Sequence, residues 1–178
     1  MKQLLLIILL TSVMIVQAQH IEETQNEFYN EKPFYIGFGL GMDYGGIGGK
    51  FEYMFADFTG LFLGVGSNFN GIGINGGVMI KPLHRKQVTP YLLGMYGYTG
   101  TVKIEGASQF NMTDYGISTG GGIEIKTMNL NIWQIGIVVP FRSQEFRDHY
   151  QFLKDHPEIS LDNELFPIQI SIGFKILI

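Results

Sequence analysis

The chain contains no cysteine. This excludes disulfides, cysteine-ligated zinc, thiol nucleophiles and a lipid anchor on a cysteine that follows a leader peptide. Charged residues make up only 16% of the 178 residues, against roughly 25% in a typical soluble domain. The net charge of −4 gives no sign of a nucleic-acid partner. Beyond residue 18 the sequence has no apolar run of the roughly 18 residues that indicate a membrane-spanning helix.

Glycine and aromatic residues are abundant instead. The chain has 24 glycines, and aromatic residues reach 13%. Low charge combined with many glycines and aromatics fits the wall of a barrel better than a surface that faces water. The length is that of one domain.

Residues 1–18, MKQLLLIILLTSVMIVQA, have the pattern of a secretory signal peptide. Lys2 supplies the positive start, Leu4–Leu10 form the apolar core, and Val16 and Ala18 are suitably placed before a cut. We therefore predict cleavage before Gln19. The alternative is a transmembrane anchor, but the apolar core is shorter than the roughly 20 residues that a spanning helix needs. Residues 19–32 are polar and acidic, and they predict a short periplasmic tail.

From residue 33 onward, bulky apolar residues alternate with glycine and polar residues. A period of two predicts β-strands, and most of these segments have the roughly ten residues that cross a bilayer at a tilt. The sequence predicts an all-β fold over residues 33–178, an eight-stranded antiparallel up-and-down transmembrane barrel. The expected strands are Phe34–Met42, Gly46–Phe55, Thr59–Gly66, Gly71–Lys81, Pro90–Tyr98, Thr113–Lys126, Asn131–Phe141 and Leu165–Ile178.

An even number of strands puts both ends of the barrel on one side. If that side is periplasmic, the connections at 56–58, 82–89 and 126–130 are periplasmic. The longest connections, 100–112 and 142–164, then face outward, as expected for outer-membrane barrels. Within the second of these, Ser143–Asp155 fits either a short amphipathic helix or a loop.

The alternation also predicts which face looks outward. Bulky residues from eight strands could not all fit inside so narrow a barrel, so we expect them to face lipid. The expected interior polar network is Lys50, Glu52, Glu124, Lys175, Asn75, Gln134 and Gln169. Inward glycines are expected to leave room for Phe62, Met79 and Tyr96. The outward aromatic residues expected at the headgroup level are Tyr53, Tyr91, Tyr115 and Trp133.

The leader, the alternating strands and the terminal strand QISIGFKILI resemble small outer-membrane barrels of Gram-negative bacteria. The resemblance is to barrels of the OmpA and OmpX kind and to the PorT-like barrels of Bacteroidetes, and it covers residues 33–178. It implies insertion by the barrel assembly machinery. That family's terminal strand usually ends in Phe or Trp, whereas this chain ends in Ile178, with Phe174 four residues earlier.

The sequence contains only weak matches to catalytic or ligand-binding motifs. Gly71–Gly76 matches G-x-G-x-x-G, but the segment continues as a strand where a dinucleotide site needs a helix. An enzyme that modifies lipid could use His149, Ser143 and either Glu145 or Asp148. Nothing in their spacing forces these side chains together. We therefore predict no catalytic, cofactor or metal residues.

The sequence favours a non-enzymatic outer-membrane protein with a structural or surface-interaction role. Its expected partners are outer-membrane lipid, the assembly machinery and a surface partner that binds the outer loops. The alternatives are an outer-leaflet enzyme that modifies lipid and a soluble periplasmic lipid-binding barrel. A small-solute channel is a weaker alternative, since an eight-stranded lumen is normally too narrow.

Overall fold

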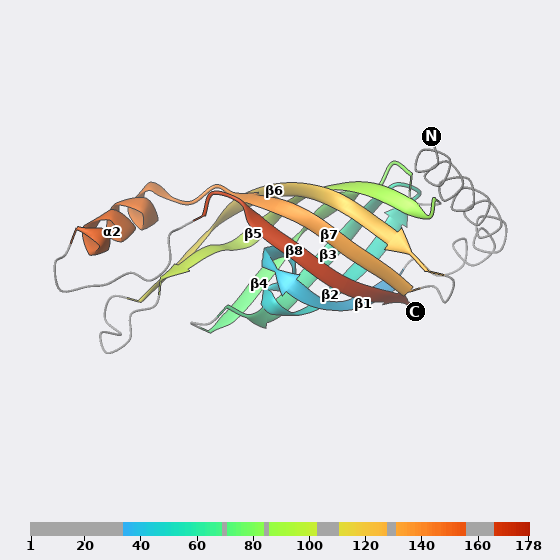
Figure 1. Ribbon diagram of the computed structural model, residues 1–178, viewed down its shortest axis with the longest axis horizontal. Coiled ribbons are helices and arrows are strands. Elements are labelled where there is room, and N and C mark those ends of the chain that lie inside the picture. The colour runs from blue at the N-terminus through green and yellow to red at the C-terminus, as the bar shows by residue number, and fades with distance from the viewer. Residues whose placement is uncertain (1–33, 69–70, 84–85, 103–110, 128–130, 156–165) are drawn as a thin grey trace, which may run out of the picture.

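The protein is a closed antiparallel β-barrel in the computed structural model, which describes residues 34–68, 71–83, 86–102, 111–127, 131–155 and 166–178. Each strand pairs with the next along the chain, and β1 also pairs with β8. Figure 1 shows the strands crossing the barrel at a tilt. The strands are β1 Phe34–Gly41, β2 Gly46–Ala56, β3 Thr59–Ser67, β4 Ile72–Ile80, β5 Val88–Val102, β6 Met112–Lys126, β7 Asn131–Pro140 and β8 Gln169–Leu177.

This topology confirms the predicted all-β, eight-stranded up-and-down barrel. Six strands lie within about a residue of their expected bounds, whereas β5 is longer at both ends and β8 is shorter. Three predicted parts lie outside the described residues. They are the signal peptide at 1–18, the acidic tail at 19–32, and the segments 103–110 and 156–165 of the long loops. The amide of Ile178 donates to the carbonyl of Phe34 at 3.0 Å, so both ends of the described barrel meet at one rim.

Burial alternates along most strands as the sequence predicts. In β1, Tyr35, Gly37 and Gly39 are buried, while Phe34, Ile36 and the other alternate residues are exposed. The apolar members of the alternating pattern face outward in β2, β3, β4, β7 and β8 as well. Phe62 and Met79 are buried, as expected.

Strand β5 has the opposite orientation to the one predicted. Tyr91, Leu93 and Met95 face the interior, and Tyr91 is only 2% exposed, whereas Tyr96 is 65% exposed. Both faces of this strand are apolar, so its composition cannot distinguish them. Room for the inward Tyr91 ring comes from β7, where a Cβ added at Gly136 would lie 2.1 Å from the phenol oxygen.

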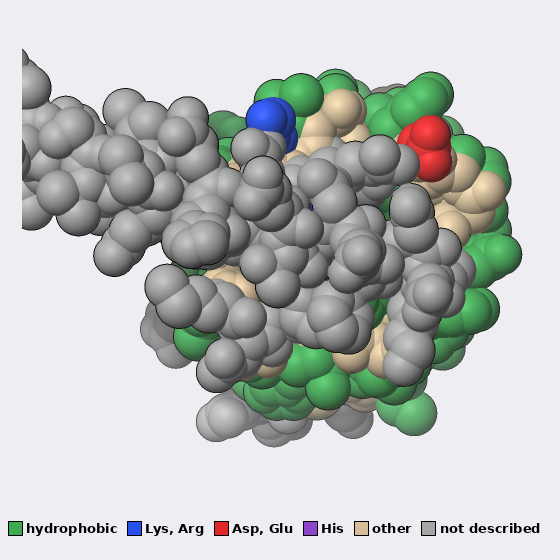
Figure 2. Space-filling model, turned by 90° about the vertical axis from the view of Figure 1, so that its right-hand side faces the viewer, with side chains coloured by type: hydrophobic (Ala, Val, Ile, Leu, Met, Phe, Trp, Pro, Cys, Tyr) green, Lys and Arg blue, Asp and Glu red, His purple; other side chains and the backbone are tan. Residues whose placement is uncertain are grey.

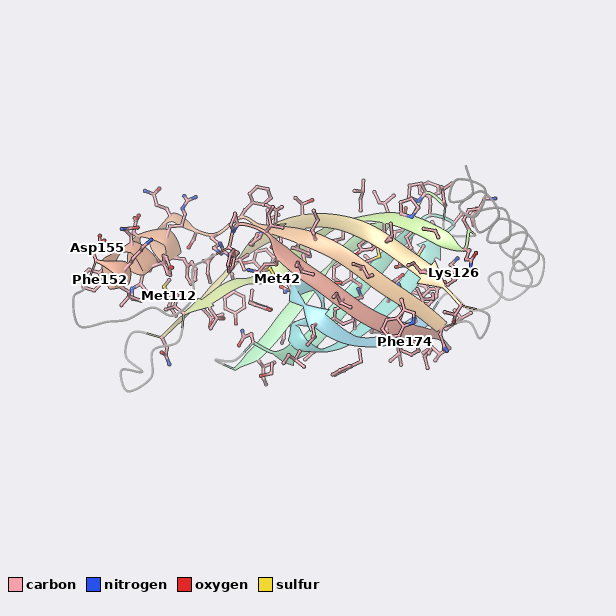
Figure 3. All side chains as sticks on the ribbon, in the orientation of Figure 1. Met42, Met112, Lys126, Phe152, Asp155 and Phe174 are labelled. Atoms are coloured by element: carbon pink, nitrogen blue, oxygen red, sulfur yellow. The ribbon has the colours of Figure 1, made fainter. Side chains whose placement is uncertain are left out.

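The connection between β1 and β2 folds into the barrel. Met42–Tyr44 form a single 3-10 turn, η1, and all three residues are buried. Gly45 closes the turn in the left-handed region at φ 76°, which only glycine adopts readily, and its amide donates to the Met42 carbonyl at 2.9 Å. Figure 3 shows Met42 between the ribbons of the barrel.

A projecting arm extends from the opposite rim. Strands β5 and β6 continue past the end of their pairing with β4 and β7, and helix α2, Gln144–Lys154, packs beside them (Figure 1). Phe146 and Leu153 of the helix are buried against Val102 of β5. Of the two alternatives for Ser143–Asp155, a short helix or a loop, the structure therefore has the helix.

Candidate functional site

The interior of the barrel holds a quartet of alternating charges. Lys175 Nζ lies 2.6 Å from Glu52 Oε2 and 2.5 Å from Glu124 Oε1. Lys81 pairs with the same two carboxylates, with its Nζ 2.9 Å from Glu124 Oε1. Both ammonium groups lie 5.1 Å from the centre of the Tyr35 ring. All four charged side chains are almost fully buried, so each charge is balanced by direct contact with opposite charge.

A second group forms around Asp43, which η1 carries into the lumen. Its carboxylate accepts hydrogen bonds from Lys50 Nζ at 2.6 Å, Gln134 Nε2 at 3.0 Å and Ser171 Oγ at 2.5 Å. These donors come from β2, β7 and β8. Charge-assisted bonds of this kind are roughly twice as strong as neutral ones. The Asp43 group therefore ties η1 to three strands of the wall.

Gln134 links this group to two tyrosines. Its Oε1 accepts from Lys50 Nζ at 2.6 Å and from the Tyr44 hydroxyl at 3.3 Å. Its Nε2 also lies 3.0 Å from the Tyr91 hydroxyl. Lys50 Nζ stands 4.2 Å from the centre of the Tyr44 ring, which adds a cation–π contact.

The side of the lumen next to β3, β4 and β5 is apolar. Its cluster is made of Met42, Phe62, Met79, Tyr91, Leu93, Met95, Tyr98 and Val138. Asn75 of β4 is fully buried beside this cluster and donates to the Met42 carbonyl at 2.5 Å. Its side-chain oxygen has no hydrogen-bond partner among the described residues.

Six of the seven residues expected in the polar network are buried inside the barrel. The structure joins Glu52, Glu124 and Lys175 through direct ion pairs, and it joins Lys50 to Gln134. Asn75 is buried apart from both groups. Gln169 is only half-buried at the start of β8, opposite Val138. No side-chain hydrogen bond of Gln169 is found among the described residues.

Asp43, Lys81 and Ser171 were not expected in the network. Asp43 lies in a segment that the sequence marks as a connection, and Lys81 ends the expected strand Gly71–Lys81 next to the connection at 82–89; charge normally faces water at such positions. Ser171 follows the alternation of β8 and could have been found from it. Tyr91 was expected on the outside, and its place in the network follows from the orientation of β5.

The outer wall of the barrel is apolar. Among the strand residues that the structure describes, none that is exposed carries a charge. Ser67 and Thr119 are the exposed polar ones, and the Thr119 hydroxyl donates to the Leu93 carbonyl at 3.1 Å. Viewed from the rim where Ile178 lies, hydrophobic side chains form most of the outline (Figure 2).

The arm has its own polar anchor. Asp114 accepts hydrogen bonds from the Ser143 amide at 3.0 Å, the Ser143 hydroxyl at 2.6 Å and the Thr99 hydroxyl at 2.5 Å. Ser143 Oγ also accepts from the Phe146 amide at 3.1 Å, which makes it the N-cap of α2. The Ser143 hydroxyl, considered above for an enzyme that modifies lipid, is thus engaged in holding the helix. His149 lies half-buried on α2.

No known protein family and no curated protein matches the chain. No group of three or more His, Cys, Asp or Glu side chains that could hold a metal ion occurs among the described residues. Within the same part of the chain, no helix is long and apolar enough to cross a membrane.

Proposed function

We propose that this protein is an integral outer-membrane β-barrel, exported by its leader and inserted in lipid, with a non-enzymatic structural or surface-interaction role. One observation carries the proposal: apart from Asp114 in the arm, the charged side chains of the strands face the lumen, and the exposed face of the strands is uncharged. A barrel in water has the opposite arrangement, because burying charge is costly and exposing so much apolar surface is unfavourable.

The height of the apolar wall fits a bilayer. Apolar residues face outward at alternate positions from Ile168 to Ile178, with Phe174 partly covered. This stretch is about 33 Å long along the strand, or about 25 Å high at a tilt of about 40°, which matches the apolar band of outer-membrane barrels.

Aromatic side chains gather toward both rims. Toward the rim with the chain ends, Phe34 stacks on Tyr53 at 4.6 Å between ring centres, and Trp133 meets Phe174 edge-on at 5.2 Å. Toward the arm, the exposed rings are Tyr96, Tyr115, Phe141 and Phe166. Two aromatic girdles are typical of barrels whose ends lie at the headgroups.

The projecting arm supports a surface-interaction role for the protein. It stands on the rim opposite the chain ends, and it has its own apolar core and its own polar anchor. If the chain ends face the periplasm, the arm faces outward, where it would bind a surface partner. A soluble lipid carrier is disfavoured, because its lumen would need apolar walls where this one holds paired charges. The enzyme alternative gains no support from Ser143, whose hydroxyl caps a helix.

Fluorescence quenching tests the insertion in lipid. Trp133 is the only tryptophan of the chain, and it is 49% exposed on the outer wall near a rim. In vesicles, we expect lipid brominated near the headgroup to quench it more strongly than aqueous acrylamide does. The double variant Trp133→Phe with Ile172→Trp moves the reporter to mid-strand, where mid-chain bromines should quench it best. Efficient acrylamide quenching of both proteins would reject insertion.

Cell fractionation provides the complementary test. The full chain with its leader should be found in the outer-membrane fraction and resist alkaline extraction. It should also migrate faster on a gel before heating than after. Recovery in the soluble periplasmic fraction would favour the lipid-carrier alternative.

A further inference from the structure

In the half of the lumen toward the arm, η1 fills space that side chains from the wall leave open. Six inward glycines make the space that it occupies. A Cβ added at any one of these glycines would come within 3 Å of η1 or of Gly45. The six are Gly39, Gly48, Gly64, Gly66, Gly73 and Gly173. These residues come from β1, β2, β3, β4 and β8. The wall therefore forms a chamber that would be open if η1 were elsewhere.

The chamber contains a complete set of donors for a carboxylate. An ammonium group from Lys50, an amide from Gln134 and a hydroxyl from Ser171 converge on the two oxygens of Asp43. All three donor residues are fixed on strands, so they do not depend on η1 for their place in the wall. These three donors would bind any carboxylate that reaches the same position.

The remainder of the chamber suits an aromatic ring. The Tyr44 ring lies under Lys50 Nζ, and its hydroxyl reaches Gln134. Next to η1 lie Phe62 and Tyr98, which form part of the apolar side of the lumen. The Asp43–Tyr44 pair thus presents a carboxylate and a phenol ring to the walls of the chamber.

Release of η1 would leave the barrel intact. The pairing of β1 with β2 ends at Gly41 and Gly46, and η1 lies outside it. Three glycines flank the turn at positive φ: Gly41 at 141°, Gly45 at 76° and Gly46 at 106°. Glycine rotates between such conformations more freely than other residues do. The turn can therefore swing out by breaking its side-chain and packing contacts without breaking the β-ladder.

We propose that this chamber is a binding site for a small aromatic carboxylate, and that η1 is its internal competitor. The external carboxylate takes the place of Asp43 on Lys50, Gln134 and Ser171, and its ring takes the place of Tyr44. This inference goes beyond the proposed function. It can be tested in detergent micelles, so it does not depend on how the barrel lies in a membrane.

Cysteine labelling measures the release of η1. Because the natural chain has no cysteine, the variant Met42→Cys carries a single thiol in the buried turn. We expect slow reaction with a water-soluble maleimide and at least tenfold faster reaction in 4-hydroxyphenylacetate. The neutral 4-hydroxyphenylacetamide and an equal concentration of NaCl should have no effect. Gly71→Cys places the thiol at an exposed position just before β4 and should react quickly under all four conditions.

Lys50→Met in the Met42→Cys background tests the donor set. Loss of the ammonium should make the labelling rates with and without the carboxylate equal, even if the labelling rate without the carboxylate changes. If Met42→Cys is unreactive with and without the carboxylate, or if the amide accelerates it equally, the proposal is wrong.

A second measurement covers the case in which the cysteine variant does not fold. In Asp43→Ala the donors have lost their internal partner, so 4-hydroxyphenylacetate should raise the urea midpoint while NaCl and the amide do not. The wild-type midpoint should rise less, because Asp43 competes. Equal midpoints of Asp43→Ala in carboxylate and in NaCl would overturn the proposal.

Discussion

The buried quartet allows a quantitative prediction for Lys175→Met. The substitution removes two ion pairs, at 2.6 and 2.5 Å. At an effective dielectric constant of about 20, each contact has a gross attraction of about 6 kcal/mol. The desolvation of the ammonium, several kcal/mol, is recovered in the variant. The two carboxylates then keep only Lys81 of the quartet as an ion-pair partner, and we expect the free energy of unfolding to fall by about 3–5 kcal/mol.

The reason for the loss is the unbalanced charge, and a double variant isolates it. Lys175→Met with Glu124→Gln restores neutrality and leaves the Glu52–Lys81 pair. We expect it to be clearly more stable than Lys175→Met alone, because replacing buried ion pairs by neutral groups of similar size is often tolerated. Ile172→Met on the outer wall of the same strand is the matched control and should change stability by less than about 0.5 kcal/mol.

Urea unfolding in phosphatidylcholine vesicles, followed by Trp133 fluorescence, gives the free energies. The double-mutant cycle then yields the coupling between Lys175 and Glu124. Unbalanced charge is not the cause of the loss if Lys175→Met is as stable as Ile172→Met, or if the double variant is no more stable than the single one. Either result would mean that water or a counter-ion neutralises the quartet.

Three further predictions concern the wall, the lumen and the arm. Ile172→Arg should lower unfolding stability in vesicles by about 2–4 kcal/mol, and Ile178→Arg at the rim by about 0–1 kcal/mol; equal losses would contradict insertion. Gly173→Ala places a Cβ 2.0 Å from the phenol that η1 inserts and should lower the free energy of unfolding by about 1–3 kcal/mol. Gly94→Ala, which meets nothing within 4 Å, should be neutral in the same urea assay. Asp114→Ala should speed amide exchange in α2 without moving the urea midpoint of the barrel; unchanged exchange would show that Asp114 does not anchor the helix.

Most of the barrel could be predicted from sequence because the two faces of most strands differ in kind. In β8, isoleucines alternate with Ser171, Gly173 and Lys175, so the inward face is evident. Strand β5 offers no such contrast. Its inward face follows instead from its partner, since Thr89 lies opposite the inward Glu124 and opposed residues share a face. That register is a property of the closed sheet and cannot be read from β5 alone.

The length of β5 was missed for a related reason. Tyr98–Val102 continue the strand beyond the barrel because α2 covers them, with Phe146 and Leu153 packed on Val102. A segment of mixed polar and small residues has weak strand propensity by itself. The contact that stabilises it comes from residues some forty positions later in the chain, which a local pattern does not include.

The position of Asp43 follows from the balance of buried charge. Lys50 points into the lumen, and the two acids that the strands bring there, Glu52 and Glu124, are both engaged by Lys81 and Lys175. An unpaired ammonium in so closed a space would be costly, so a third acid has to come from outside the strands. A turn at the arm-side rim can supply it by folding inward, which is what η1 does. The need to pair the buried Lys50 ammonium, more than any local propensity of Met42–Tyr44, therefore accounts for the direction in which this turn folds.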